Sequence, residues 1–274
     1  MKNKKRLDII LVEKGYFKSR SKASSYISTG RIFINNTRQD KPGKLFSPDE
    51  IKNVKIYEPE KYVSRGGYKL EKALNTFNIK LLGKVALDIG ASTGGFTDCL
   101  LQYGVKKVYA VDVGYGQLDL KLRNDPRVIL CEKTNIRYID EKTFYEKIDI
   151  VTVDVSFISV KKFLHILIPY LNSDFDIIVL IKPQFEAEKK EVKKGVVRDK
   201  SVHIKVLQRF LEYINSIKLK IVNLTYSPIK GPKGNIEFLS HIKDNGESIK
   251  IDDIVNIVEE SEKLKTGSPH FKLN

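Results

Sequence analysis

Five polar side chains in this sequence each follow, directly or within a few residues, a hydrophobic run of strand length. They are Asp88, Asp112, Asn135, Asp154 and Lys182. Ligands of open α/β sheets bind at the carboxyl ends of parallel strands, so we expect these side chains to meet in one cleft. Carboxylates there could accept hydrogen bonds from a ligand, and a desolvated lysine could act as a general base.

A glycine-rich segment, residues 84–97 (KVALDIGASTGGFT), predicts a strand, a tight turn and a helix. Three residues separate Gly90 from Gly94, which departs from the dinucleotide pattern, and the Gly-Lys-Ser/Thr ending of a P-loop is missing. Asp88 before the turn would disfavour a phosphate and favour a cation. We interpret the segment as a site for S-adenosylmethionine, whose sulfonium and amino groups are positive. A structural turn without a ligand is the alternative.

Asp112 follows Gly90 by 22 residues, which suits a carboxylate that accepts hydrogen bonds from ribose hydroxyls. An NAD site would use the same arrangement, so this residue indicates a nucleoside without naming the ligand. Asn135 could contact adenine or cap the following helix. The residues predicted to bind the cofactor are Asp88, Gly90, Ser92, Thr93, Gly94, Gly95, Phe96, Asp112, Asn135 and Asp154.

Lys182 ends a buried hydrophobic run and precedes Pro183. A lysine at the end of a core strand either extends to water or is held there for function. An RNA contact without a part in chemistry is a further alternative for this side chain.

Strand and helix patterns alternate after the glycine-rich segment, which predicts an α/β fold with a Rossmann-like, doubly wound parallel sheet. A closing antiparallel hairpin around the Gly-Pro-Lys-Gly turn would complete seven strands. The expected strands lie within residues 84–89, 105–114, 127–136, 148–157, 176–185, 220–228 and 235–242, and helices are expected at 66–77, 96–103 and 159–171.

The first 58 residues predict a separate small α+β domain, followed by a linker at 59–64 and the main domain at 65–274. Helices are expected near 6–15 and 19–30, and strands at 31–36 and 51–57. Residues 1–62 hold 15 basic and 7 acidic residues and so carry over half of the chain's net charge of +15. This concentration favours a polyanionic partner, most simply nucleic acid, over a generally lysine-rich surface.

Composition excludes several classes of protein. No run of 18 apolar residues exists, and the basic N-terminus is a poor signal peptide, so we expect a cytoplasmic protein without a membrane partner. The cysteines, Cys99 and Cys131, suit a reducing compartment, although a disulfide between them remains open. The four histidines are scattered, so we expect no metal, and we expect a monomer. The segment 243–274 suggests no function.

The stretch RLDIILVEKGYFKSRSKASSYISTGRIFINN resembles an S4 domain, a small RNA-binding module. The similarity covers most of residues 5–57 and implies contacts with structured RNA, largely through phosphates and shape. By this analogy the RNA-binding residues are Arg6, Arg20, Lys22 and Arg31, and we add Arg65 at the start of the second domain. Each could instead be a solvated surface charge.

Four residues in order, Lys69, Asp154, Lys182 and Glu237, are similar to the Lys-Asp-Lys-Glu set of the FtsJ/RrmJ-type ribose 2′-O-methyltransferases. Lys69 and Glu237 are selected by this resemblance alone, because their spacing in the sequence does not identify them. Taken with SRGGYKLEKAL, LDIGASTGGFTD, DVSFIS, LIKPQFE and GPKGNIE, the order of segments from about residue 5 to 241 resembles the TlyA (haemolysin A) family. It implies methylation of a cytidine ribose 2′-hydroxyl in 16S rRNA, 23S rRNA or both, with S-adenosylmethionine as donor.

Two roles for Lys182 stay open at this point. It could take the proton of the 2′-hydroxyl as a general base, or it could stay protonated and stabilise the developing alkoxide. Three other functions are alternatives to the enzyme: a non-catalytic rRNA-binding or assembly factor, a pseudouridine synthase and a membrane-lytic protein. The glycine-rich segment and the absence of a Gly-Arg-Leu-Asp motif argue against the synthase, and no apolar segment supports lysis.

Overall fold

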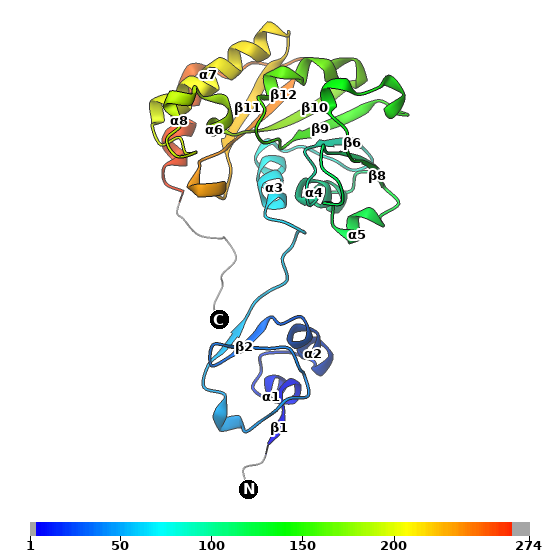
Figure 1. Cartoon of the computed structure of the whole chain (residues 1–274), viewed down its shortest axis with the longest axis vertical. Helices are drawn as coiled ribbons and strands as arrows, with labels where there is room; N and C mark the ends of the chain where they lie inside the picture. The colour runs from blue at the N-terminus through cyan, green and yellow to red at the C-terminus, as the bar shows by residue number, and fades with distance from the viewer. Residues whose placement is uncertain (1–3, 265–274) are drawn as a thin grey trace. The chain divides into compact units, whose positions relative to one another are not determined.

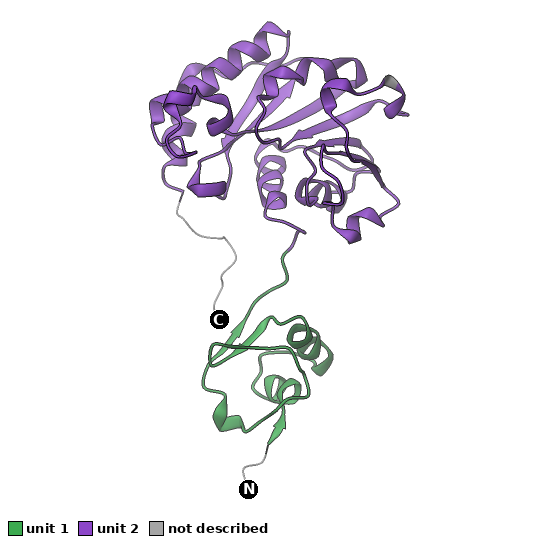
Figure 2. Cartoon of the chain, viewed as in Figure 1, with its two compact units in different colours: residues 1–60, 268–274 green, residues 61–267 purple. Residues whose placement is uncertain are grey.

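The computed structural model describes residues 4–264 and divides them into two compact units. One unit ends at Glu60 and the other begins at Lys61, and Figure 2 shows the two in different colours. The division falls inside the predicted linker, residues 59–64. That this stretch acts as a linker, and that the functional domains end at 58 and begin at 65, remain predictions.

The N-terminal unit combines two short helices with small antiparallel sheets (Figure 1). The side chain of Ser19 accepts a hydrogen bond from the Lys22 amide and so caps α2. Asn35 and Asn36 have φ values of 50° and 66°, which form the predicted tight turn between β2 and β3. The elements are β1 (Lys5–Arg6), α1 (Leu7–Glu13), α2 (Arg20–Ser28), β2 (Ile32–Ile34), β3 (Thr37–Gln39), β4 (Leu45–Phe46), η1 (Pro48–Glu50) and β5 (Val54–Ile56).

The second unit is built on one seven-stranded sheet in the order β11-β12-β10-β9-β6-β7-β8. Strand β12 runs antiparallel to its neighbours β10 and β11, and the other pairs are parallel. The predicted Rossmann-like methyltransferase sheet with its closing hairpin is therefore confirmed. The strands are β6 (Val85–Ile89), β7 (Lys107–Val111), β8 (Val128–Cys131), β9 (Ile148–Val153), β10 (Leu171–Ile181), β11 (Lys220–Tyr226) and β12 (Phe238–Lys243).

Helices cover both faces of this sheet (Figure 1). Leu87 on β6 packs into one core with residues of α7 and α8, whereas its neighbour Ala86 packs into a second core with α3 and α4. This alternation follows from the period of two along a strand. The helices are α3 (Gly66–Phe77), α4 (Gly95–Gln102), α5 (Leu120–Arg123), α6 (Pro183–Glu186), α7 (Lys200–Ser216) and α8 (Ile251–Ser261), with 3₁₀ turns η2 (Ile136–Tyr138), η3 (Glu141–Thr143), η4 (Val160–Lys162), η5 (Leu164–Tyr170), η6 (Lys189–Glu191) and η7 (Pro232–Gly234).

One sequence-based expectation needs correction, and one segment that suggested no function has a structural role. The helix predicted at residues 159–171 is instead a pair of 3₁₀ turns, η4 and η5, and Pro169 lies inside the second. Proline lacks the amide proton that a continuous α-helix would need at this position. The segment 243–274, which suggested no function, contains α8, whose buried Ile254 and Val258 complete the core on the α7 face. The part of this segment after residue 264 lies outside the described residues.

Three further observations concern residues 4–264. None of the helices in this range combines the length and the apolar character needed to cross a membrane. Both cysteines are free, with Cys99 buried and Cys131 half-buried. No group of histidine, cysteine or acidic side chains in the described part of the chain is arranged to hold a metal ion.

Candidate active site

The four residues of the predicted Lys-Asp-Lys-Glu set meet in one cavity. Lys69 lies in the first turns of α3, Asp154 and Lys182 directly follow β9 and β10, and Glu237 directly precedes β12. Because β12 runs antiparallel to β10, its first residue reaches the same edge of the sheet as the last residue of β10. The cavity has a volume of about 390 Å³ and is lined by all four side chains.

Lys69 and Glu237 form a buried ion pair. The Lys69 ammonium donates to Glu237 Oε2 at 2.6 Å, and the two side chains are only 11% and 0% exposed. The other carboxylate oxygen, Oε1, is buried without a hydrogen-bond partner among the described residues. A Cβ atom on Gly231 would lie 2.1 Å from that oxygen, so only glycine leaves room for the carboxylate here.

Lys182 and Asp154 form the second pair. The Lys182 ammonium lies 2.5 Å from Asp154 Oδ1, with side-chain exposures of 11% and 21%. It also donates a hydrogen bond to Ser156 Oγ at 3.0 Å. Sequence reasoning missed Ser156, although its position two residues after a strand-end aspartate was a usable signal.

The glycine-rich turn is shaped by close backbone contacts. Gly90 has φ +83°, and a Cβ on it would lie 2.4 Å from the Asp154 carbonyl oxygen. A Cβ on Gly95 would lie 2.3 Å from Ser64 Oγ. The turn therefore approaches its neighbours more closely than any side chain would permit. Residues of the turn that line the cavity of the ion pairs are Gly90, Ala91, Ser92, Thr93, Gly95 and Phe96, and Arg65 at the start of α3 lines it as well.

We expected Asp88 and Gly94 to contact the ligand directly, but neither residue lines a cavity at this edge of the sheet. Asp88 is fully buried and lines neither of the cavities at this edge of the sheet. Its oxygens accept hydrogen bonds from Thr97 Oγ1 at 2.6 Å and Thr152 Oγ1 at 2.8 Å. Burial raises the pKa of Asp88 to about 6, against the effect of these two hydroxyls. Gly94, at φ +98°, is the N-cap residue directly before α4 and also lies outside both cavities.

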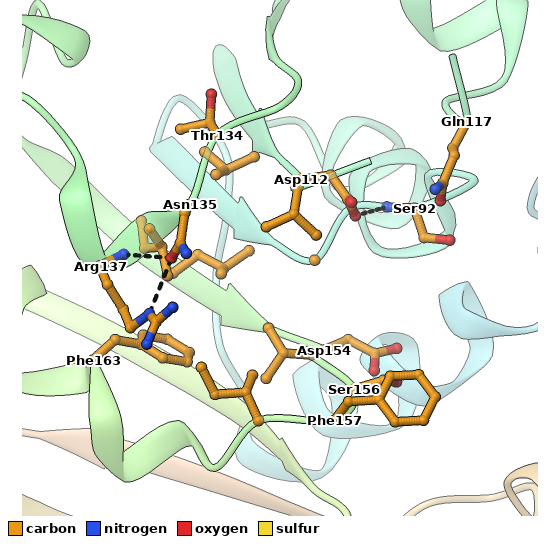
Figure 3. A pocket seen from close by; sticks show the side chains of 17 residues that line it. Ser92, Asp112, Gln117, Thr134, Asn135, Arg137, Asp154, Ser156, Phe157 and Phe163 are labelled. Carbon is orange, nitrogen blue, oxygen red and sulfur yellow. Dashed lines mark hydrogen bonds between the residues drawn. The ribbon is translucent and has the colours of Figure 1, made fainter. Parts of the chain in front are cut away.

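A second cavity, of about 530 Å³, adjoins the first (Figure 3). Asp112 lies at its rim, where its two oxygens accept hydrogen bonds from the Ser92 amide at 2.8 Å and the Gly114 amide at 2.7 Å. Asn135 lines the cavity and also caps η2, where its side-chain oxygen accepts a hydrogen bond from the Arg137 amide. Its contact with adenine remains a prediction. Gly90, Ser92, Asp154 and Ser156 line both cavities.

This paired cavity fits an elongated nucleoside-containing ligand. Its carboxylates can accept hydrogen bonds from ribose hydroxyls, and Gly90 lets the turn lie close against the Asp154 carbonyl. Arg137, Thr134 and Phe157 also line the second cavity and were not predicted from the sequence. They follow strands β8 and β9 by a few residues, and the strand-end argument used only one polar residue after each strand, Asn135 and Asp154.

The basic residues predicted in the N-terminal unit are partly organised by Asp8. Its carboxylate pairs with Arg6 at 2.9 Å and with Arg20 at 3.0 Å. The Arg6 hydrogen bond, assisted by Arg20, holds the pKa of Asp8 below its ordinary value despite burial. The Arg6 and Arg20 side chains are 42% and 57% exposed, while Lys22 is exposed and Arg31 half-buried. Their contact with RNA remains a prediction.

Comparison with known proteins agrees with this geometry. An FtsJ-like methyltransferase model matches residues 62–243, and an S4 domain model matches residues 5–51. Hemolysin A of Brachyspira hyodysenteriae is 48% identical over 239 residues, which cover 86% of this chain and 98% of that protein. The 16S/23S rRNA (cytidine-2′-O)-methyltransferase TlyA of Mycobacterium tuberculosis is 38% identical over 239 residues, 87% of this chain and 89% of that protein. The chain belongs to the TlyA family of FtsJ-like methyltransferases.

A solved structure confirms the fold of this TlyA-family chain. A protein from Streptococcus thermophilus is 39% identical, and the similarity covers 96% of this chain and 97% of that one with a TM-score of 0.73. The family and both domain types predicted from the sequence are thus confirmed. The FtsJ-like match spans all four residues that meet in the ion-pair cavity.

Proposed function

We propose that this chain transfers a methyl group from S-adenosylmethionine to the ribose 2′-hydroxyl of a cytidine in 16S rRNA, 23S rRNA or both. The observation that carries the proposal is the meeting of Lys69, Asp154, Lys182 and Glu237 in one cavity beside the glycine-rich turn. The name of the Mycobacterium tuberculosis relative describes this reaction for that protein. A chain of the same family with the four residues assembled is expected to act on the same class of substrate.

The two adjoining cavities would hold the donor. Asp112 would accept hydrogen bonds from the ribose hydroxyls, because each of its oxygens keeps a further lone pair beyond its backbone contact. Asn135 and the residues around it would face the base, and the turn from Gly90 to Phe96 would lie against the amino-acid portion. Asp88 would act indirectly by fixing the turn through Thr97 on α4. When bound, S-adenosylmethionine supplies a methyl group activated by its sulfonium charge.

The chain's own residues would act on the acceptor. A ribose hydroxyl is a weak acid, and Lys182 in its neutral form, after its own proton has passed to solvent, would take the hydroxyl proton as the oxygen becomes the nucleophile. Asp154 orients Lys182 through the 2.5 Å contact. Lys69, fixed by Glu237, contributes positive charge at the same cavity and so stabilises an oxygen that becomes negative. Exclusion of water from this largely buried set strengthens each of these interactions.

The S4 domain would supply much of the RNA affinity. Its exposed guanidinium groups can contact phosphates, which gives binding that depends strongly on salt and little on sequence. Arg65 lies exposed at the edge of the ion-pair cavity and would meet RNA close to the reacting nucleotide. We therefore infer that residues 1–58 bind rRNA and residues 65–274 carry out methyl transfer.

The decisive experiment incubates the purified chain with methyl-labelled S-adenosylmethionine and ribosomal subunits that lack the modification. The rRNA is then digested to nucleosides and analysed by mass spectrometry. We expect the label in 2′-O-methylcytidine, and separate digestion of 16S and 23S rRNA identifies the subunit. Label on a base would assign a different reaction, and bound rRNA without label would favour the non-catalytic assembly factor.

A further inference from the structure

We propose that Ser156 is a positioning residue that fixes the direction of the Lys182 ammonium group; this inference rests on the proposed function. Ser156 Oγ accepts a hydrogen bond from Lys182 Nζ at 3.0 Å. Ser156 also lines both cavities described above and a third of about 290 Å³, which is lined by Lys182 and Glu237 as well. The serine therefore stands where the three cavities join, beside the reacting lysine.

A lysine needs a second partner before its direction is defined. Its four-carbon side chain rotates freely, and an ammonium group can face one carboxylate oxygen in many orientations. Asp154 Oδ1 at 2.5 Å provides the charged partner, and Ser156 provides a second acceptor in another direction. The Ser156 contact is a hydrogen bond and the Asp154 contact is an ion pair, so two separate neighbours limit the directions that the lysine nitrogen can take. The neutral amine, which is the form that acts as a base, has two protons and one lone pair, and the lone pair can then face the substrate hydroxyl.

The loop that carries Ser156 is itself held at both ends. The Asp154 amide donates to the Ile89 carbonyl at 2.9 Å, at the end of β6. At the other end, Ser159 Oγ and the Val160 amide donate to the Glu186 carboxylate at 2.7 and 3.1 Å. Glu186 belongs to α6, the short helix that begins directly after Lys182. The same contacts therefore fix the loop relative to the strand end that bears the lysine.

The backbone next to Ser156 is strained. Phe157 has φ +66°, a left-handed conformation that residues with a Cβ atom rarely adopt. Its side chain is 90% exposed, so burial of the ring does not compensate for this conformation. Strain of this kind persists where surrounding contacts hold it, and it is commonly found at functional sites. Here it turns the chain so that Ser156 faces Lys182.

The test compares Ser156→Ala, Ser156→Thr and the wild type. Ser173→Ala, an exposed serine at the start of β10, is the matched control. Single-turnover methylation of rRNA is measured with saturating donor, together with the Kd for S-adenosylmethionine. We expect the alanine variant to lose about tenfold to a hundredfold in rate at unchanged donor Kd, as for a hydrogen bond to a charged group. Threonine, which keeps the hydroxyl, should restore most of the rate.

A second measurement does not depend on catalysis. The rate of reductive methylation of Lys182 is followed by peptide mass spectrometry in the absence of RNA. We expect this rate to be higher in Ser156→Ala than in the wild type, and unchanged in Ser156→Thr and Ser173→Ala.

The outcomes separate this inference from the proposed function. A wild-type enzyme that makes no 2′-O-methyl product would refute the proposed function, and the reactivity of Lys182 would still test the role of Ser156. Wild-type rate and reactivity in Ser156→Ala would overturn the inference, as would a threonine variant as slow as the alanine variant. A raised donor Kd without a change in rate would also overturn it, since Ser156 would then be a ligand contact.

Discussion

The Lys69 ammonium lies 2.6 Å from Glu237 Oε2, and 168 positions separate the two residues in the sequence. The contact joins the first helix of the catalytic unit, α3, to the start of β12 in the closing hairpin. Because both side chains are buried, the pair ties the site to the packing of the whole unit. It also keeps a positive charge at the cavity that Lys182 and Asp154 share.

Removal of one partner of this pair should destabilise the fold as well as abolish activity. Lys69→Met leaves a buried carboxylate without its cation, and we expect a loss of about 3–5 kcal/mol in the free energy of unfolding. The double variant Lys69→Met/Glu237→Leu should recover much of that stability without recovering methylation. Urea denaturation of the two single variants and the double variant measures the coupling. Strictly additive losses would show that the two side chains do not interact.

Gly231→Ala should displace the Glu237 carboxylate, because the new methyl group would lie 2.1 Å from Oε1. We expect a loss of about 1–3 kcal/mol in unfolding free energy from overpacking, and a marked fall in methylation. The control places the same substitution in a Glu237→Ala background, where the obstructing carboxylate is gone. If Gly231→Ala destabilised both backgrounds equally, its methyl group would be acting on some other part of the loop and not on the Glu237 carboxylate.

Asp112→Ala should weaken donor binding through two effects. It removes the acceptor for ribose hydroxyls, and it releases the amides of Ser92 and Gly114 that the carboxylate holds. We expect the Kd for S-adenosylmethionine to rise about tenfold to a hundredfold, measured by isothermal titration calorimetry. Asp112→Asn, which keeps one acceptor oxygen, should have a smaller effect. An unchanged Kd in the alanine variant would remove Asp112 from the donor site.

Acid stability should depend on Asp176, at the other end of the sheet. Burial alone would raise the pKa of this carboxyl, but hydrogen bonds from His241 at 2.8 Å and Lys84 at 2.6 Å hold its pKa well below the ordinary value. A lowered folded-state pKa gives stability that is present above the unfolded pKa of about 3.9 and lost as the pH falls below it. Asp176→Asn should therefore be less stable at neutral pH and should show a flatter acid dependence.

Urea unfolding at pH 7 and at several values between about pH 5 and pH 3 checks this expectation, since that range spans the ordinary titration of an aspartate. Asp174→Asn is the matched control, because Asp174 pairs with Lys243 but its side chain is 79% exposed. Screened surface pairs contribute little to stability. A flattening in the Asp174 variant equal to that in the Asp176 variant would contradict the assignment.

The strand-end argument predicted much of the site from the sequence. It placed Asp112, Asp154 and Lys182 at one edge of the sheet, because side chains at the ends of parallel strands converge whatever the details of packing. It could not find Lys69, which lies on a helix, or Glu237, which precedes an antiparallel strand. Family resemblance supplied those two residues, and the structure brings all four into one cavity.

Other differences have physical causes that the sequence pattern conceals. Asp88 precedes the turn and suggested a ligand contact, but the period of two along β6 directs it into the core between Thr97 and Thr152. The apolar run 159–171 has the composition of a helix, and Pro169 interrupts it. Gly231 acts through its distance to Glu237 Oε1, which no sequence pattern gives.

The most direct test of the account is single-turnover methylation by Lys182→Ala with bound donor and rRNA. General acid–base catalysis contributes about 10²–10⁴ in rate, so we expect a loss of that size at unchanged donor Kd. The pH profile of the wild type should show an inflection on the acid side that the variant lacks, while Lys218→Ala, an exposed control, should behave as wild type. A Lys182→Ala enzyme that methylates rRNA at the wild-type rate would contradict the central claim.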